Sequence, residues 1–183
     1  MEVLVNGEKR EIPEGLSVSA LIEHLGMPLD RVALERHLAV NLFGTYGVSQ
    51  ALLPLLTRSR GAIFNVLSVA SLAALPIIPA YSISKAAAFS LTQSLRALLA
   101  RQGVSVHAVL AGPVDTDMSR GFEVPKASPE SVARTIFDGV ERGEEDIFPD
   151  PVSASMAESW RSGAVKAAER QFAGLVAPEP VNA

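Results

Sequence analysis

A tyrosine and a lysine four residues apart carry the most distinctive chemistry of this 183-residue sequence. Tyr81 and Lys85 lie in YSISKAAAFSLTQSL, which has the pattern of a helix. Because a helix places residues i and i+4 on one face, the Tyr81 hydroxyl and the Lys85 ammonium can share one pocket. A nearby cation stabilises the phenolate form of a tyrosine. The pair can therefore act as a general acid or base at an alcohol or carbonyl oxygen.

Two polar residues precede this pair. Ser68 ends the stretch from Gly61 to Ser68, whose apolar and β-branched residues predict a buried strand. Open α/β sheets place their sites at the carboxyl ends of strands, which is where this serine falls. Asn41 lies in LAVNLFGTYGVSQALLPLL, which predicts a long, mostly apolar helix.

Together these segments resemble the short-chain dehydrogenase/reductase family. The resemblance covers about residues 38–172 and is carried, in order, by VNLFGTYGVSQALLPLL, GAIFNVLS, YSISKAAAFSLTQSLRALLA and GVSVHAVLAGPVDTDM. It implies an α/β chain with part of a Rossmann-like three-layer fold, built of parallel strands and flanking helices. It also implies an NAD(P)-dependent oxidoreductase that acts on a ketone or an alcohol.

The same resemblance implies a catalytic role for four residues. Tyr81 would exchange a proton with the reacting oxygen, and Ser68 would hydrogen-bond that oxygen. Lys85 would stabilise the tyrosinate and bind the nicotinamide ribose hydroxyls. Asn41 would bridge to Lys85 through an ordered water and so complete a proton relay.

The nicotinamide end of the cofactor would be lined by the segment after the next strand. The residues that the resemblance assigns to the cofactor are Lys85, Gly112, Pro113, Val114 and Thr116. The family has Pro-Gly after this strand, whereas this chain reads Ala111-Gly112-Pro113. For Thr116 and Asp117 a helix cap or a turn is an equally good interpretation.

The glycine-rich loop that would cradle the dinucleotide phosphates has no counterpart in this sequence. Gly44 with Gly47 lies inside an apolar helix pattern, and Gly139 with Gly143 lies at a helix end. The Asn-Asn-Ala-Gly segment of the family and an acidic residue for the adenosine ribose are also absent. Binding of NAD or NADP is therefore expected to be weak or absent.

Residues 1–37 differ in character from the rest. MEVLVNGEKREIPEG predicts two strands around a turn at Asn6-Gly7, LSVSALIEHLGMP predicts a helix capped by Ser17, and RVALERH predicts a further strand. This ββαβ order, with VNGE, PEGLSVSALIEHLG and RVALER, resembles the first half of the bacterial thiamin-pathway sulfur carrier, a ubiquitin-like protein. That carrier needs a terminal Gly-Gly, and this chain ends APEPVNA, so its function is not supported.

The chain is thus interpreted as a chimera or an unusual fusion. We expect a β-grasp-like segment at 1–37, a catalytic half at 38–176 and a disordered tail at 177–183. Beyond the site, the patterns predict the following elements: a helix over Ser82–Arg101, a strand over Val104–Leu110, a substrate-covering loop over Met118–Ala127, a helix starting at Ser128-Pro129, a strand at Ile147-Phe148 and a helix over Ser153–Phe172.

Composition excludes several classes of function. A formal net charge of -4 without basic runs argues against nucleic-acid binding, and the lack of cysteine excludes disulfides and thiol chemistry. His24, His37 and His107 show no metal-ligand spacing, so no metal site is predicted. Gly61–Ser84 is uncharged, but its polar residues and prolines fit a strand and an active-site loop better than a membrane span. We expect a cytoplasmic protein.

Assembly and activity leave alternatives open. The apolar helices around Asn41 and Tyr81 predict a homodimer, since a single copy would expose a large apolar patch. The chain is either an oxidoreductase impaired by the missing phosphate loop or an inactive scaffold or interaction protein without cofactor binding. A third possibility is that a separate polypeptide supplies the missing half.

Overall fold

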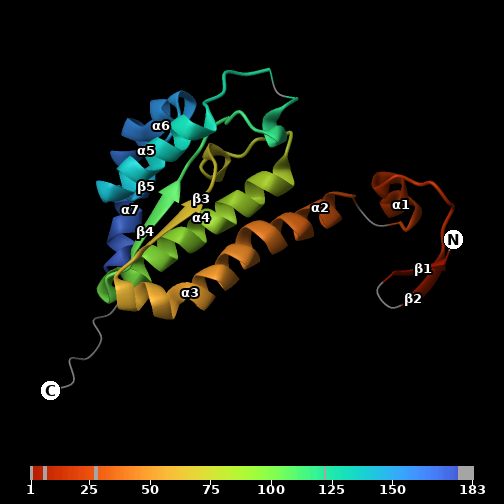
Figure 1. Cartoon of the computed structure of the whole chain (residues 1–183), viewed down its shortest axis with the longest axis horizontal. Coiled ribbons are helices and arrows are strands. Elements are labelled where there is room, and N and C mark those ends of the chain that lie inside the picture. Colours follow the sequence, from red (N-terminus) through yellow and green to blue (C-terminus); the bar gives the residue numbers. More distant parts are fainter. Residues whose placement is uncertain (1, 6–7, 27–28, 122, 177–183) are drawn as a thin grey trace.

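The computed structural model describes residues 2–5, 8–26, 29–121 and 123–176. Figure 1 shows an α/β protein with helices around a central sheet. The strands are β1 (Glu2–Val5), β2 (Glu8–Glu11), β3 (Ala62–Val66), β4 (Ser105–Val109) and β5 (Asp146–Ile147). The α-helices are α1 (Val18–His24), α2 (Leu29–Leu38), α3 (Thr45–Ser59), α4 (Pro79–Leu99), α5 (Pro129–Glu141), α6 (Pro151–Arg161) and α7 (Ala164–Ala173). Ala39–Gly44 is a π-helical turn, and 3-10 helices cover Val69–Ser71, Ala100–Gln102 and Asp117–Ser119.

The central sheet is parallel and has β4 in the middle. β3 pairs with β4 from Ala62–Ser105 to Val66–Val109, and β4 pairs with β5 through Ala108 and Asp146. Parallel neighbours need crossover connections, and the helices α4 and α5 supply them. The predicted α/β Rossmann-like fold, with parallel strands and flanking helices, is confirmed.

Helices cover the two faces of the sheet and make three layers. Successive side chains of a strand point to opposite faces, so Ala108 and Val109 of β4 belong to different clusters. Ala108 packs in a cluster with Phe89 of α4, and Val109 packs with Ile136 of α5. A third cluster joins α3, α4 and β4 through Leu56, Leu95 and Val106. The core therefore lies on both sides of β4.

Several predicted boundaries agree with the structure. The long helix α4 passes into a 3-10 turn and ends at Gly103, whose φ of 74° is the left-handed conformation that favours glycine. Ser128 caps α5, its Oγ accepting a hydrogen bond from the Ser131 N–H at 3.2 Å, and Pro129 occupies the first turn. These caps fix where the helices around the sheet begin and end.

The predicted strand over RVALERH is wrong. Residues 31–37 lie inside α2, which continues through the π-helical turn into α3 (Figure 1). Ala33, Leu34 and Glu35 are strong helix formers, and the apolar helix that follows extends without a break into this segment. The run of β-favouring residues is too short to outweigh that continuity.

The predicted ββαβ unit is accordingly not formed. β1 and β2 make an antiparallel hairpin from Glu2–Glu11 to Val5–Glu8, and within the described residues they pair only with each other. The predicted turn at Asn6-Gly7 and the tail 177–183 lie outside the described residues. Ser17 caps α1 as expected, accepting from the Ala20 N–H at 3.2 Å.

The single helix predicted over Ser153–Phe172 is two helices. The chain leaves the helical conformation at Gly163 (φ -76°, ψ 155°), between α6 and α7. A Cβ at this glycine would stand 2.8 Å from the Ser159 carbonyl oxygen, so only glycine permits the close approach. The break lets α7 turn back toward α4.

In the part of the chain that the structure describes, one helical stretch is long and apolar enough to cross a membrane by length and composition. It is Val32–Ser59, with a mean hydropathy of 1.2 and only 6% of its segment buried. The core helix of a soluble protein passes the same test, so this stretch alone does not place the chain in a membrane.

Candidate active site at the carboxyl end of β3

Tyr81 and Lys85 share one face of α4. The Lys85 Nζ lies 5.7 Å from the centre of the Tyr81 ring. The turn spacing of the helix therefore brings the two side chains together, as the i, i+4 pattern predicts. His37 of α2 packs its ring edge-on to Tyr81, with centroids 5.9 Å apart. His37 therefore packs against the candidate acid/base.

The Lys85 ammonium is held by the neighbouring strand. Its Nζ donates a hydrogen bond to the carbonyl oxygen of Val66 at 2.9 Å. Burial lowers the pKa of Lys85 below its usual value, because the charged form loses contact with water. The lysine is thus anchored at the carboxyl end of β3.

Ser68 lies where the sequence predicts, directly beyond β3. It is buried and caps the short 3-10 helix after the strand, its Oγ accepting a hydrogen bond from the Ala70 N–H at 3.1 Å. The cap fixes the serine in the turn between β3 and α4. The candidate site is therefore built at the strand end where open α/β sheets place their ligands.

Asn41 contacts α4 through a residue that the sequence analysis missed. Its Nδ2 donates to Ser84 Oγ at 2.9 Å, and Ser84 Oγ donates to the Tyr81 carbonyl oxygen at 2.8 Å. Ser84 is fully buried. A small polar residue three positions after Tyr81, on the apolar side of the helix, was the available signal. The asparagine thus ties the π-helical turn to the helix that carries the tyrosine and the lysine.

The predicted cofactor segment follows β4. Val114 makes a parallel bridge to Ala127, so the loop is closed at its base. Thr116 begins the 3-10 helix Asp117–Ser119, and its N–H donates to Ser119 Oγ at 3.3 Å. The interpretation of Thr116 as a cap is therefore correct. Its contact with a cofactor stays a prediction.

Asp150 anchors the start of this loop and was not predicted. Its buried carboxylate accepts hydrogen bonds from the Gly112 N–H at 2.6 Å and from the Ser153 hydroxyl at 2.6 Å. It also caps α6 by accepting from the Val152 and Ser153 N–H groups, each at 3.0 Å. Asp-Pro before a helix pattern signals a cap, but nothing in the sequence indicates the bond to Gly112. One carboxylate thus joins the end of β4 to the start of α6.

Replacing Gly112 with alanine is expected to destabilise the protein by about 1–3 kcal/mol, since a Cβ there forces neighbouring atoms to move. That Cβ would stand 2.5 Å from Asp150 Oδ1 and 3.2 Å from Val152 Cβ. Gly47→Ala is the matched control, because nothing lies within 4 Å of a Cβ built there. Urea denaturation measures both variants. Equal free energies of unfolding for the two variants would refute the crowded Gly112 site.

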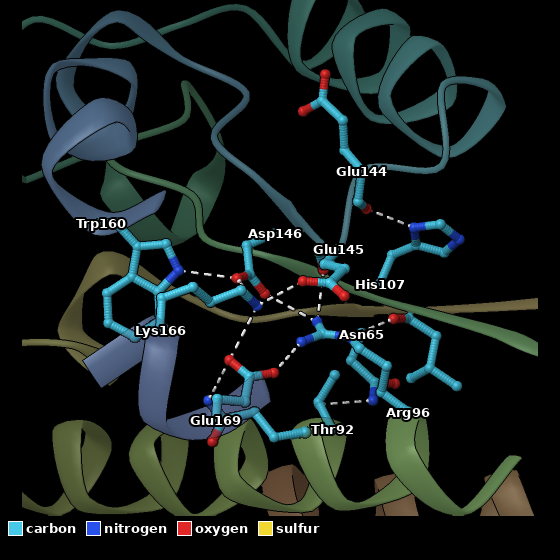
Figure 2. Close-up of polar contacts among 12 residues, drawn as sticks. Asn65, Thr92, Arg96, His107, Glu144, Glu145, Asp146, Trp160, Lys166 and Glu169 are labelled. Atoms are coloured by element: carbon cyan, nitrogen blue, oxygen red, sulfur yellow. Dashed lines mark hydrogen bonds and ion pairs between the residues drawn. The ribbon is translucent and has the colours of Figure 1, made fainter. Parts of the chain in front are cut away.

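A buried charge cluster joins α4, β5 and α7 (Figure 2). Lys166 is 1% exposed, and its Nζ contacts Asp146 Oδ2 at 2.6 Å and Glu169 Oε2 at 2.9 Å. Arg96 donates to Asp146 Oδ1 at 2.8 Å and pairs with Glu169. The Trp160 Nε1 donates to Asp146 Oδ2 at 2.8 Å. The cluster holds the carboxyl-terminal helices against the sheet.

The same cluster predicts a loss of stability in acid. Burial alone would raise the pKa of Asp146, but the Arg96 charge and the hydrogen bonds from Lys166 and Trp160 hold it below its ordinary value of 3.8. A carboxyl group with a lowered folded pKa stabilises the protein above that ordinary value, and the stabilisation is lost as the pH falls through the folded pKa. The melting temperature should therefore fall below about pH 4. Asp146→Asn should fall less steeply over that range, since Glu145 keeps its own lowered pKa, and a wild-type profile that is flat would contradict the prediction.

Comparisons with known proteins identify the fold family. The sequence profile described as short chain dehydrogenase matches residues 18–126. A protein from Xanthobacter autotrophicus named "Inactive 2-(S)-hydroxypropyl-CoM dehydrogenase 2" is 43% identical over 103 residues, which is 55% of this chain and 45% of that protein. "2-(S)-hydroxypropyl-CoM dehydrogenase 3" of the same organism is 38% identical over 109 residues, 58% of this chain and 43% of that protein. The chain spans less than half the length of these curated relatives.

A solved structure extends the similarity beyond the profile. The crystal structure of a short chain dehydrogenase from Burkholderia cenocepacia in complex with NADP has a TM-score of 0.69 and 33% sequence identity. The similarity covers 82% of this chain and 62% of that one. The profile match extends over more than half of the sequence and includes Asn41, Ser68, Tyr81 and Lys85. The chain belongs to the short-chain dehydrogenase family.

Proposed function

We propose that this chain carries the catalytic half of a nicotinamide-dependent oxidoreductase that acts on a ketone or an alcohol. The observation that carries the proposal is the Tyr81–Lys85 pair, with the Lys85 Nζ 5.7 Å from the Tyr81 ring, at the end of the strand that leads to Ser68. A phenol, an ammonium and a serine hydroxyl at one strand end are the groups that proton transfer at a carbonyl oxygen requires. Family membership supports this assignment.

Each residue has a proposed task in that chemistry. Tyr81 gives a proton to the carbonyl oxygen during reduction and takes it back during oxidation, while Ser68 hydrogen-bonds the same oxygen. Lys85 favours the tyrosinate electrostatically and binds ribose hydroxyls. Asn41 holds the site together through Ser84, and a water next to it would complete the route to Lys85.

The proposed cofactor is NAD or NADP, which would supply or accept the hydride. Gly112, Pro113, Val114 and Thr116 are proposed to contact its nicotinamide end, and the NADP complex of the Burkholderia cenocepacia relative supports this class of cofactor. This sequence has no glycine-rich loop for the phosphates of that cofactor. Each missing charge-assisted hydrogen bond would cost about 1.5–3 kcal/mol, so we propose weak binding.

A fluorescence titration with NADH and NADPH tests this proposal. Saturable binding by the purified chain, weakened in Lys85→Met, would support it, and a screen of ketones would follow. No binding at millimolar cofactor would reject the oxidoreductase assignment for this chain. The substrate class is then irrelevant, because hydride transfer needs the nicotinamide.

The alternative is a family member without catalysis that serves as a scaffold or an interaction protein. Two observations favour it: Lys85 is engaged by the Val66 carbonyl, and Asn41 is engaged by Ser84. The relative that carries "Inactive" in its name is compatible with such a loss. A folded chain with no cofactor affinity would support this alternative. Restored binding on addition of a phosphate-loop half-domain would instead support a second polypeptide as its source.

Three further proposals concern the rest of the chain. We propose that residues 1–37 share their origin with a sulfur carrier. The short chain dehydrogenase profile matches from residue 18, so only residues 1–17 of that segment lie outside the family match. A homodimer is proposed, with Tyr46 of α3 and Ile83 of α4 exposed on the helices around Asn41 and Tyr81. A cytoplasmic location is also proposed, and cell fractionation tests it.

A further inference from the structure

The Lys85 amine lies in a part of the molecule without acidic side chains. Its Nζ donates to the Val66 carbonyl oxygen at 2.9 Å, and within the described residues it pairs with no carboxylate. The buried Lys166, by contrast, contacts three carboxylates. Lys85 is also the only charged residue between positions 61 and 95, the stretch that supplies β3 and most of α4. No neighbouring anion therefore holds this amine in its charged form.

This setting favours the neutral, nucleophilic amine. Burial lowers the pKa of Lys85, and no carboxylate compensates for the lost contact with water. The side chain is nevertheless only half-buried, and its bond to Val66 lies at the surface, so a small molecule can reach the nitrogen. A desolvated lysine that stays accessible is the kind of lysine that attacks carbonyl carbons.

The groups around the amine suit addition to a carbonyl. Tyr81 faces it from the same helix, with the Lys85 Nζ 5.7 Å from the ring, and His37 of α2 packs on that tyrosine. The phenol can give a proton to a carbonyl oxygen as the nitrogen attacks the carbon. The Val66 oxygen already accepts a hydrogen bond from Nζ, so it can accept the single N–H of a protonated imine as well.

The segment between Ser68 and Tyr81 presents an apolar surface beside the site. The Leu75 N–H donates to Ser82 Oγ at 3.0 Å, which holds this segment against the first turn of α4. Leu75 and Ile77 are 43% and 80% exposed. An uncharged carbonyl compound with an apolar substituent is therefore the ligand class that this surface favours.

We propose that Lys85 forms an imine with aldehydes that carry an apolar substituent. The Nζ lone pair attacks the carbonyl carbon, Tyr81 gives its proton to the carbonyl oxygen, and the attacking nitrogen returns a proton to the tyrosinate. The C–O bond of this carbinolamine then breaks, Tyr81 protonates the departing oxygen, and the C=N bond forms. One aldehyde and one amine give one imine and one water. The inference is independent of the oxidoreductase proposal, because no hydride moves and no nicotinamide is needed.

Trapping with benzaldehyde and sodium cyanoborohydride, on the full chain without nicotinamide, tests this reaction. The reductant converts an imine into a stable secondary amine, and peptide mass mapping locates it. The label is expected on Lys85. Lys126 is the matched internal control: it is also half-buried and donates to the Ser119 carbonyl oxygen at 2.7 Å, but its pocket also contains Asp115 and Asp117.

Two variants separate the roles at the site. Lys85→Arg keeps a donor for the Val66 carbonyl but has no amine, so the label at position 85 should disappear. Tyr81→Phe keeps the ring against His37 and loses only the hydroxyl. It is expected to slow labelling of Lys85 by about 100-fold, the usual contribution of a positioned acid.

Label that concentrates on Lys85 and slows in Tyr81→Phe supports the proposal. Equal labelling of Lys85 and Lys126, or the same rate at Lys85 with and without the Tyr81 hydroxyl, overturns it. If the variants do not fold, the wild type decides by its ratio of label on Lys85 to label on Lys126. A ratio that falls to about one in urea supports a folded site, and a ratio that urea does not change overturns it. The cofactor titration is a separate measurement, so its failure rejects the oxidoreductase proposal alone.

Discussion

Replacing Lys166 with methionine is expected to lower the free energy of unfolding by about 3–5 kcal/mol. Lys166 is 1% exposed and its ammonium lies within 3 Å of both Asp146 and Glu169, so its removal leaves buried carboxylates without one of their cations. Methionine keeps the length of the side chain, which limits the cavity. The remaining cation, Arg96, already pairs with both carboxylates and cannot take the place of the lost one.

Thermal and urea unfolding measure this effect. For a chain of this size the melting temperature should fall by about 10 °C, at roughly 2–4 °C per kcal/mol. Lys9→Met is the matched control: Lys9 pairs with Glu2 at 2.8 Å, but its side chain is 72% exposed. An exposed pair is worth at most about 1 kcal/mol. Similar losses in the two variants would show that the buried cluster contributes no more than a surface pair.

Tyr81→Phe is expected to lower any ketone reduction by about 100-fold to 10,000-fold, the usual contribution of a positioned general acid. The ring stays in place against His37 and Lys85, and only the hydroxyl is lost. Cofactor affinity should therefore change little, so the loss should fall on kcat. Stopped-flow oxidation of NADPH with a saturating ketone measures it.

The control for this prediction is the other tyrosine of the sequence. Tyr46 lies on α3 and is half exposed, so Tyr46→Phe should leave the rate unchanged. Equal activity of Tyr81→Phe and the wild type would remove Tyr81 from the chemistry. No turnover by the wild type with any ketone would favour the scaffold alternative, for which the tyrosine is a packing residue.

The central part of the fold could be predicted because its signals are local. The apolar run up to Ser68, the stop at Gly103 and the cap at Ser128 each depend on a few neighbouring residues, and all three agree with the structure. The Tyr81–Lys85 pair was found for the same reason, since one turn of a helix sets its geometry.

The errors and omissions involve longer-range effects. RVALERH has local strand character, but the helix that follows decides its conformation. The bond from Gly112 to Asp150 and the Lys166 cluster join residues that are distant in the sequence, and no periodicity indicates such pairs. A glycine within a helical pattern is compatible with one continuous helix, yet Gly163 has an extended conformation between α6 and α7 and allows α7 to turn back. Burial of charge is a tertiary property, which explains why Lys166 was missed.

The hydrogen bond between Lys85 and Val66 has a consequence for ligand binding. An ammonium has three N–H donors, and this bond uses one of them, so the strand carbonyl fixes where the other two can reach a ribose. The Leu67 N–H donates to the Val109 carbonyl oxygen of β4, and backbone groups alternate in direction along a strand, so the Val66 oxygen faces the edge of β3 away from β4. A backbone N–H brought to that oxygen would compete for it and free the lysine to move. Occupancy of the edge and occupancy of the cofactor site would then be thermodynamically linked. By reciprocity, the cofactor would favour edge pairing by the same factor with which edge pairing favours the cofactor.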